Sequence, residues 1–106
     1  MSGRLTTHVL DTTRGLPAGG VSVSVTRDGS PVSEVVTDAD GRALLCTGVW
    51  FTAGRYELVF AIGDYFDEPA RFLDLVPIRV TIDDARRNWH VPLLCSPFAY
   101  STYRGS

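Results

Sequence analysis

The two histidines are the side chains of this 106-residue chain best suited to acid–base chemistry. An imidazole titrates near neutral pH, so it can take a proton from water and return it to a leaving group. His8 lies in the run LTTHVLD and His90 in the run WHVPLLC, and both runs resemble β-strands. Side chains alternate between the two faces of a strand, and Trp89, Val91 and Leu93 form the bulkier apolar set of the second run. We therefore expect both histidines to point away from the core, where an ordinary surface position is the alternative to a catalytic one.

Apolar side chains share the faces that carry these histidines. Alternation places Leu10 on the face of His8, and it places Pro92 and Leu94 on the face of His90. Such a face is too apolar to be only solvated, and a patch of this kind often marks an interface or a binding site. We therefore expect these faces to be covered in the working protein.

One arginine and the C-terminal residues are the remaining candidates for chemistry. Arg42 follows the turn DADG at the start of an apolar run, where a solvated turn charge is the usual role. The tail FAYSTYRGS is rich in aromatic residues, and alternation places Tyr103 away from the core and Arg104 on the opposite face. We expect this tail to be ordered, with the carboxylate of Ser106 either acting as a functional group or ending a docked strand.

Several other kinds of chemistry find no support in the sequence. All ten basic residues are arginines, which excludes Schiff-base chemistry on lysine. Neither a phosphate-binding glycine loop, nor a nucleophile elbow, nor a metal motif is present. Cys46 and Cys95 stand 49 positions apart, which fits neither a metal site nor a CxxC pair. We expect no metal and no cofactor, and we expect buried free thiols in a reducing compartment, with a disulfide as the alternative.

Short apolar runs alternate with turn residues along the whole chain. Runs such as VSVSV and VPIRVTI have the period of two that is typical of strands with one buried face. Segments such as RGLPAGG, DGSP and DADG contain the residues that turns need. Only GDYFDE, at positions 63–68, predicts a helix. The predicted strands are Leu5–Asp11, Val21–Arg27, Val32–Thr37, Arg42–Thr47, Tyr56–Ile62, Pro77–Asp83, Trp89–Cys95 and Ala99–Arg104.

Eight short strands in a chain of this length predict one all-β domain, residues 1–106, folded as a β-sandwich. The formal net charge of −2 gives no basic excess for nucleic acid. No run approaches the ~20 apolar residues of a membrane span, and the first residues hold no apolar stretch of signal-peptide length. We therefore expect a cytoplasmic protein that binds neither nucleic acid nor membrane.

Three segments resemble the transthyretin-like family, and in particular its 5-hydroxyisourate hydrolase branch. They are LTTHVLDTTRGLPAGGVSVSV, TDADGR and WHVPLLCSPFAYSTYRGS, and the intervening GRYELVF and GDYF fit the same pattern. The terminal YRGS is the most specific mark, because it separates the hydrolases from the hormone-carrying transthyretins. The resemblance implies a transthyretin-like β-sandwich of two four-stranded sheets with one short helix. It also implies a homotetramer, a dimer of dimers, with active sites in a channel between the dimers.

The same resemblance implies a reaction and a set of site residues. The reaction is hydrolysis of 5-hydroxyisourate to 2-oxo-4-hydroxy-4-carboxy-5-ureidoimidazoline in urate breakdown. His8, Arg42 and His90 are the implied catalytic residues, and Tyr103 and Ser106 join His8 and Arg42 in binding the substrate. One imidazole would take a proton from water, while the other orients the water or protonates the departing nitrogen. Which histidine does which is open, and Arg42 would stabilise the developing oxyanion.

Two other functions compete with hydrolysis. A non-enzymatic transthyretin-like carrier of small ligands would share the fold without turnover, and an adhesive sandwich would neither bind the ligand nor turn it over. The presence of His8, Arg42 and His90 together favours catalysis, because the hormone carriers of the family lack this polar set.

Overall fold

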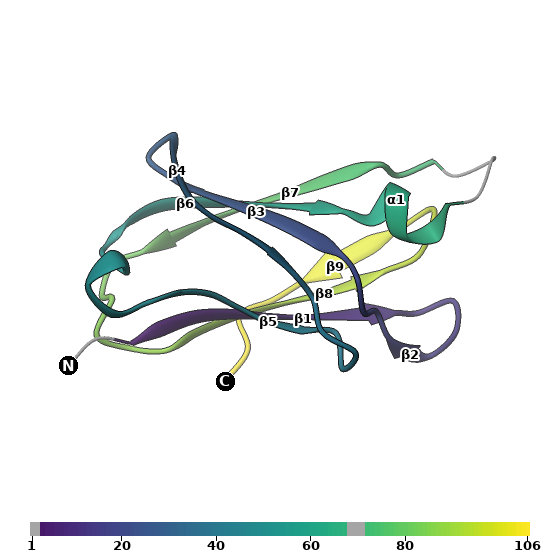
Figure 1. Cartoon of the computed structure of the whole chain (residues 1–106), viewed down its shortest axis with the longest axis horizontal. Helices are drawn as coiled ribbons and strands as arrows, with labels where there is room; N and C mark the ends of the chain where they lie inside the picture. The colour runs from purple at the N-terminus through teal and green to yellow at the C-terminus, as the bar shows by residue number, and fades with distance from the viewer. Residues whose placement is uncertain (1–2, 68–71) are drawn as a thin grey trace.

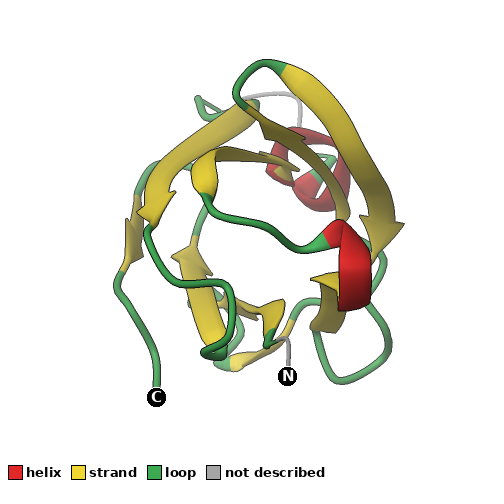
Figure 2. Ribbon diagram, turned by 90° about the vertical axis from the view of Figure 1, so that its left-hand side faces the viewer, coloured by secondary structure: helices red, strands yellow, loops and turns green. Residues whose placement is uncertain are grey.

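Two β-sheets lie face to face in the computed structural model, which describes residues 3–67 and 72–106 (Figures 1 and 2). A one-turn 3-10 helix, η1 (Gly48–Trp50), and a short α-helix, α1 (Ile62–Phe66), accompany them. The strands are β1 (Arg4–Asp11), β2 (Leu16–Pro17), β3 (Ser22–Arg27), β4 (Ser30–Val36), β5 (Arg42–Thr47), β6 (Gly54–Ala61), β7 (Leu75–Ile82), β8 (Trp89–Cys95) and β9 (Tyr100–Thr102).

Strand β1 is the centre of one sheet. It pairs with β8 in parallel along one edge, and β8 pairs in turn with β9. Its other edge is shared, because β5 pairs with residues 4–8 and β2 with residues 10–11. This sheet therefore has four rows of backbone, although five strands compose it. The second sheet has the order β4-β3-β6-β7 with antiparallel pairs throughout.

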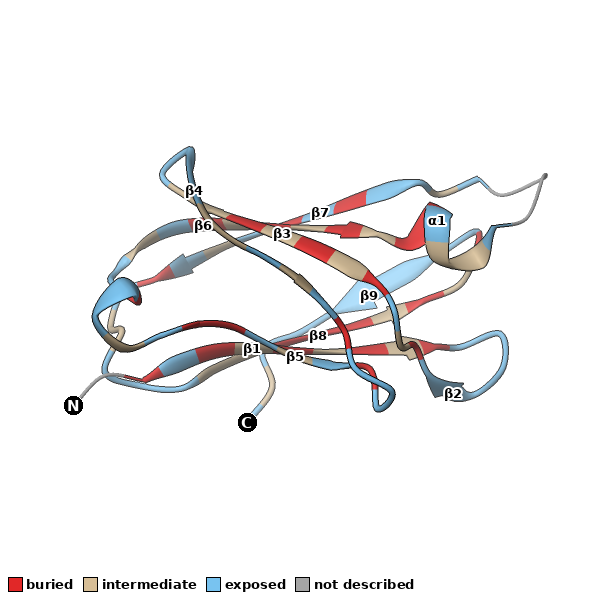
Figure 3. Cartoon of the chain, viewed as in Figure 1, coloured by how far each residue is buried: buried red, intermediate tan, exposed pale blue. Residues whose placement is uncertain are grey.

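The core lies between the two sheets and follows the alternation of the strands (Figure 3). Every second residue of β1 and β6 is buried, from Leu5 to Asp11 in the first and from Tyr56 to Phe60 in the second. Full burial of a large apolar side chain contributes about 1.5–3 kcal/mol, so these inward sets hold the sheets together. The outward sets are left free to carry other chemistry.

The predicted sandwich is confirmed, with local differences. Arg42–Thr47 and Trp89–Cys95 have the predicted bounds, and the other strands differ by one or two residues at an end. The turn segment RGLPAGG contains the unpredicted β2, which forms because it meets β1 across the sheet edge. The helix covers 62–66 in place of 63–68, and Glu68 lies outside the described residues. Pro92 is buried within the single chain, so its predicted place in an exposed apolar patch is wrong.

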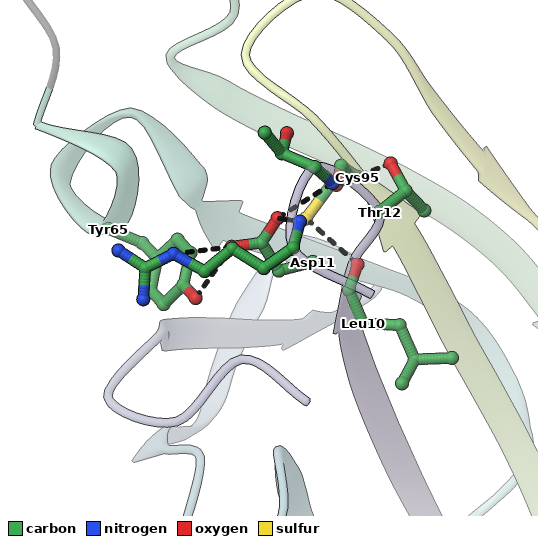
Figure 4. A network of polar contacts seen from close by, with 7 residues as sticks. Leu10, Asp11, Thr12, Tyr65 and Cys95 are labelled. Atoms are coloured by element: carbon green, nitrogen blue, oxygen red, sulfur yellow. Dashed lines mark hydrogen bonds and ion pairs between the residues drawn. The ribbon is translucent and has the colours of Figure 1, made fainter. Parts of the chain in front are cut away.

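A buried carboxylate ties α1 to the end of β1 (Figure 4). Asp11 is 1% exposed, and its Oδ1 accepts the backbone N–H groups of Thr13 and Arg14. Tyr65 of α1 donates its O–H to Oδ2 over 2.9 Å. Burial raises the pKa of Tyr65, and the bond to Asp11 raises it further, so the phenol remains a donor. With these partners, the carboxylate has a structural role.

Both cysteines are buried free thiols, as predicted. Cys95 closes β8 beside Asp11, and its Sγ lies 3.6 Å from the carbonyl oxygen of Leu10 (Figure 4). Burial raises the pKa of Cys95 to about 11, which keeps the thiol protonated and unreactive. None of the helices in the described part of the chain is long and apolar enough to cross a membrane.

Candidate active site

The antiparallel pairing of β1 and β5 brings His8 and Arg42 together. The two residues stand directly opposite each other, so their Cβ atoms are about 4.5–5.5 Å apart. The turn before β5 is held by Asp38, whose Oδ1 accepts the N–H of Arg42 at 3.0 Å. Gly41 in this turn has a φ of +75° and packs against the backbone of Val9, which leaves no room for a Cβ. The turn therefore passes close to β1 and sets Arg42 beside His8.

Strand β8 supplies His90 from the other edge of β1. The strands run parallel with Thr6 opposite His90, and Oγ1 of Thr6 lies 2.8 Å from Nδ1 of the imidazole. His8 follows two residues after Thr6 and therefore points to the same side of the sheet. The burial patterns confirm that both histidines lie on the outer face, away from the core.

A hollow of about 430 Å³ opens on this face. Of the predicted site residues, Arg42, His90 and Ser106 line it, and His8 stands next to it through its pairing with Arg42. The volume is within the range of sites for small molecules. Its polar lining residues are Arg4, Thr6, Thr7, Asp38, Arg42, Asn88, His90 and Ser106.

Electrostatics favour the neutral form of His90. The pKa of His90 lies below its usual value, mainly because the ring is partly buried and then because His8 and Arg42 are close enough to repel a positive charge. A neutral imidazole has one nitrogen that accepts and one that donates a hydrogen bond. At neutral pH the site thus combines an uncharged imidazole with a fixed positive charge.

The C-terminal tail is ordered against His90, as predicted. It leaves β9 and crosses the outer side of the sheet (Figure 1), where the N–H of Gly105 donates to the carbonyl oxygen of His90 at 2.7 Å. A Cβ at position 105 would stand 2.6 Å from Cδ2 of the His90 ring, so only glycine fits there. Arg104 turns to the other side and stacks on Trp89, with Cζ 3.9 Å from the ring centre. This agrees with the structural role that alternation indicates for Arg104.

Tyr103 is the predicted site residue that the single chain does not bring to the hollow. Its side chain is 59% exposed, and it borders a different depression between β7 and β9 with Arg104 and Trp89. Tyr100 pairs with Cys95 and Gly105 with His90, so the tail keeps the same register against β8 at both points. This register places Tyr103 opposite Pro92. In the single chain, Tyr103 therefore lies beside Trp89 and Val91 and outside the hollow.

Sequence reasoning did not single out four polar residues of the hollow. Arg4 and Thr6 share the face of His8 by alternation, and Asn88 shares that of His90, so strand period alone could have indicated them. Asp38 lies in the turn DADG, borders the hollow and holds the backbone of Arg42. The sequence feature that could have indicated this role is the position of Asp38 in a tight turn, four residues before an arginine.

The site is built for acid–base chemistry on a small polar molecule. Two imidazoles can move a proton, and a guanidinium can bind an anion or a developing oxyanion. Within residues 3–67 and 72–106, no group of three or more His, Cys, Asp or Glu side chains is arranged to hold a metal ion.

Known proteins are similar to this chain in sequence as well as in architecture. The profile of the HIUase/transthyretin family matches residues 5–105. The 5-hydroxyisourate hydrolase of Mesorhizobium japonicum is 56% identical over 98% of this chain and 93% of its own length. The solved structure of Klebsiella pneumoniae 5-hydroxyisourate hydrolase is 37% identical with a TM-score of 0.87, over 98% of this chain and 99% of that chain.

The likeness extends to a carrier protein. Sea bream transthyretin, solved in complex with thyroxine, is 28% identical with a TM-score of 0.88, over 96% of this chain and 94% of that chain. The fold is thus common to a 5-hydroxyisourate hydrolase and a transthyretin, and the identity is higher to the hydrolases. The sequence match and the shared architecture together show that this chain belongs to the HIUase/transthyretin family.

Proposed function

We propose that this protein hydrolyses 5-hydroxyisourate in urate breakdown, with His8, Arg42 and His90 as its catalytic residues. The observation that carries the proposal is the convergence of two imidazoles and one guanidinium from three strands on one face, beside a hollow of suitable size. Relatives named 5-hydroxyisourate hydrolase, at 56% identity in one case, support the choice of substrate.

The reaction adds one water molecule across an amide of the substrate's six-membered ring. An imidazole takes a proton from water as the water oxygen attacks the carbonyl carbon, and the carbonyl oxygen gains negative charge. The guanidinium of Arg42 stabilises that charge. The C–N bond then breaks, and the departing nitrogen takes the proton from the imidazolium, which leaves a carboxyl group and an open ring. Water is the nucleophile in this proposal: no serine or cysteine in the described part of the chain hydrogen-bonds a histidine, and the hydroxyl of Thr6, which does contact His90, is assigned another role below.

Ser106 and Tyr103 complete substrate binding in this proposal. Ser106 lines the hollow, where its side-chain hydroxyl can bind the substrate. Tyr103 lies outside the hollow of its own chain, so it contacts substrate in a site shared with another copy.

The assembly that would share such sites is a homotetramer, a dimer of dimers. Leu10 and Leu94 are half-exposed on the outer face of the histidine-bearing sheet, and Leu44 is 49% exposed beside them. A second copy placed over this face would bury these side chains and close the open side of the hollow. Covering an apolar face of this kind is what stabilises most homo-oligomers.

The site supports the function of a ligand carrier less well than it supports hydrolysis. Binding a hormone-sized ligand needs an apolar cavity, whereas this hollow has a polar lining with two arginines and a histidine. A proton-transferring set has no use in a passive carrier.

The decisive experiment is a direct assay. Urate oxidase generates 5-hydroxyisourate, and its ultraviolet absorbance is followed with and without the protein. The expected result is a faster decay that His8→Gln, His90→Gln and Arg42→Gln each slow on the order of 10²–10³-fold. Activity is expected to survive EDTA. An unchanged decay with the wild-type protein contradicts the proposed function, and loss in EDTA with recovery on added zinc contradicts the metal-free reaction.

We also infer a cytoplasmic location. Cys46 and Cys95 are free thiols, which suits a reducing compartment.

A further inference from the structure

Thr6 and His90 form a side-chain contact that the proposed reaction does not yet use. Oγ1 of Thr6 lies 2.8 Å from Nδ1 of His90, and the two side chains are partly buried between neighbouring strands. The residues are opposite each other in the register of β1 and β8, so the backbone keeps the two side chains together. Both also line the hollow.

Two placements of the hydrogens fit this contact. If Nδ1–H donated to Oγ1, the hydroxyl hydrogen of Thr6 would turn to water in the hollow, because residues 3–67 and 72–106 give it no second partner. If the hydroxyl donates to Nδ1, both groups are satisfied, and the neutral ring carries its hydrogen on Nε2. The other ring nitrogen, Nε2, makes no hydrogen bond to the described residues and is therefore available to a molecule in the hollow.

The ring is also confined on its other side. The tail passes so close that a Cβ at Gly105 would stand 2.6 Å from Cδ2, the carbon next to Nε2. Thr6 at Nδ1 and Gly105 at Cδ2 thus leave the imidazole little freedom to rotate. Such a fixed orientation is what a hydrogen-bond donor to a transition state requires.

We propose that Thr6 is a positioning residue, whose hydroxyl donates to Nδ1 of His90 and holds that imidazole as an Nε2–H donor to the substrate. The inference rests on the proposed hydrolysis and assigns the two histidines different tasks. His90, neutral and with Nε2 protonated, donates a hydrogen bond to the carbonyl oxygen as it becomes an oxyanion. His8 takes the proton from the attacking water and returns it to the departing nitrogen.

Neutral imidazole can serve as an electrophile of this kind when its environment keeps it uncharged. The lowered pKa of His90 agrees with this role, because burial, His8 and Arg42 all disfavour the imidazolium. A general base, by contrast, needs a free lone pair, and in this tautomer the lone pair of His90 is engaged by Thr6.

The tautomer can be measured without any substrate. The chain has two histidines, so two-bond ¹H–¹⁵N correlation spectra of the labelled protein show two imidazoles, and His8→Gln identifies the signals of His90. At pH 8 we expect the Nε2–H form for His90 in the wild type and in Thr6→Ser, and a mixture of tautomers in Thr6→Val. A wild-type ring with its hydrogen on Nδ1, or an unchanged pure Nε2–H ring in Thr6→Val, overturns the proposal.

Kinetics provide the second measurement. Thr6→Val keeps the shape of threonine and removes the hydroxyl, so kcat should fall about 10–100-fold, the usual effect of losing a partner that orients an imidazole. Thr6→Ser should restore most of it. Thr26→Val, a matched change in β3 of the other sheet, should leave kcat unchanged. Thermal midpoints show whether each variant is folded.

The outcomes separate this inference from the proposed function. An active wild type with an equally active Thr6→Val contradicts the role of Thr6 and leaves the hydrolase intact. An inactive wild type contradicts the hydrolase, while the spectra still test the hydrogen bond. A substrate adduct on Thr6 in mass spectra would make Thr6 a nucleophile, which also overturns the positioning role.

Discussion

At the scale of single residues, the site depends on charges that lie close together. Arg42 and His8 stand opposite each other, and both lower the pKa of His90. The pKa of His90 in the folded protein therefore lies below its ordinary value of 6.5. At pH values between the pKa of His90 in the folded protein and 6.5, the unfolded chain binds more protons than the folded one. The resulting stability is complete above about pH 6.5 and is lost as the pH falls through the folded pKa.

The change Arg42→Gln tests this coupling together with catalysis. Removing the guanidinium removes one of the charges that repel the imidazolium, so the pKa of His90 should rise toward 6.5. An NMR titration of the two imidazoles measures the shift. Arg4, Asp38 and Ser106 border the same hollow and stay in place. Arg55→Gln, on the other sheet, is the control, and an unmoved pKa in Arg42→Gln would contradict the electrostatic account.

At the scale of elements, the C-terminal tail acts on the site more than on the fold. Removing Tyr103–Ser106 loses the stacking of Arg104 on Trp89 and the bond from Gly105 to His90. These contacts are worth about 0.5–2 and about 0.5–1.5 kcal/mol, a modest part of the total stability.

The truncated chain should therefore fold and lose catalysis. We expect its rate to fall by at least the order of 10²-fold that single catalytic groups contribute, because Tyr103, Ser106 and the confinement of His90 are all lost. Steady-state rates and thermal midpoints of the truncated and full-length proteins test this prediction. Near-full activity in the truncated form would mean that the tail is only structural.

The junction of α1 with β1 is the opposite case, an element contact with no catalytic part. Tyr65 donates to the buried carboxylate of Asp11 (Figure 4). Hydrogen bonds to charged groups contribute about 1.5–3 kcal/mol, so Tyr65→Phe should lower the free energy of unfolding by about that amount. Urea titration measures it, and Tyr100→Phe, on an exposed ring, is the control. A large fall in kcat in folded Tyr65→Phe would show that this junction does affect the site.

At the scale of the whole molecule, the proposed tetramer covers the outer face of the histidine-bearing sheet with a second copy. Leu94→Asp puts a charge on that face, where a single chain tolerates it because the side chain is partly exposed. We expect the variant to be a smaller species in light scattering, with a near-native thermal midpoint and much lower activity. Val36→Asp, on a 59% exposed side chain of the other sheet, is the matched control. A wild-type monomer at micromolar concentration would contradict the tetramer.

Local pattern was sufficient to predict the strands and the faces of the histidines. Trp89–Cys95 and Arg42–Thr47 have the predicted bounds, and His8 and His90 point away from the core as alternation indicates. The reason is that the period of two is a property of the extended backbone, so it needs no knowledge of the neighbouring strand.

Only the tertiary structure decided which side chains meet. Thr6 and His90 are 84 positions apart, and they touch because β1 and β8 pair in one particular register. Pro92 is buried and Tyr103 is absent from the hollow for reasons of the same kind. A one-residue shift in register would leave the alternating pattern of every strand intact. It would move the core-facing side chains of the shifted strand to the outer face of the sheet. The pairing of distant strands, which the whole core selects, therefore determines the site.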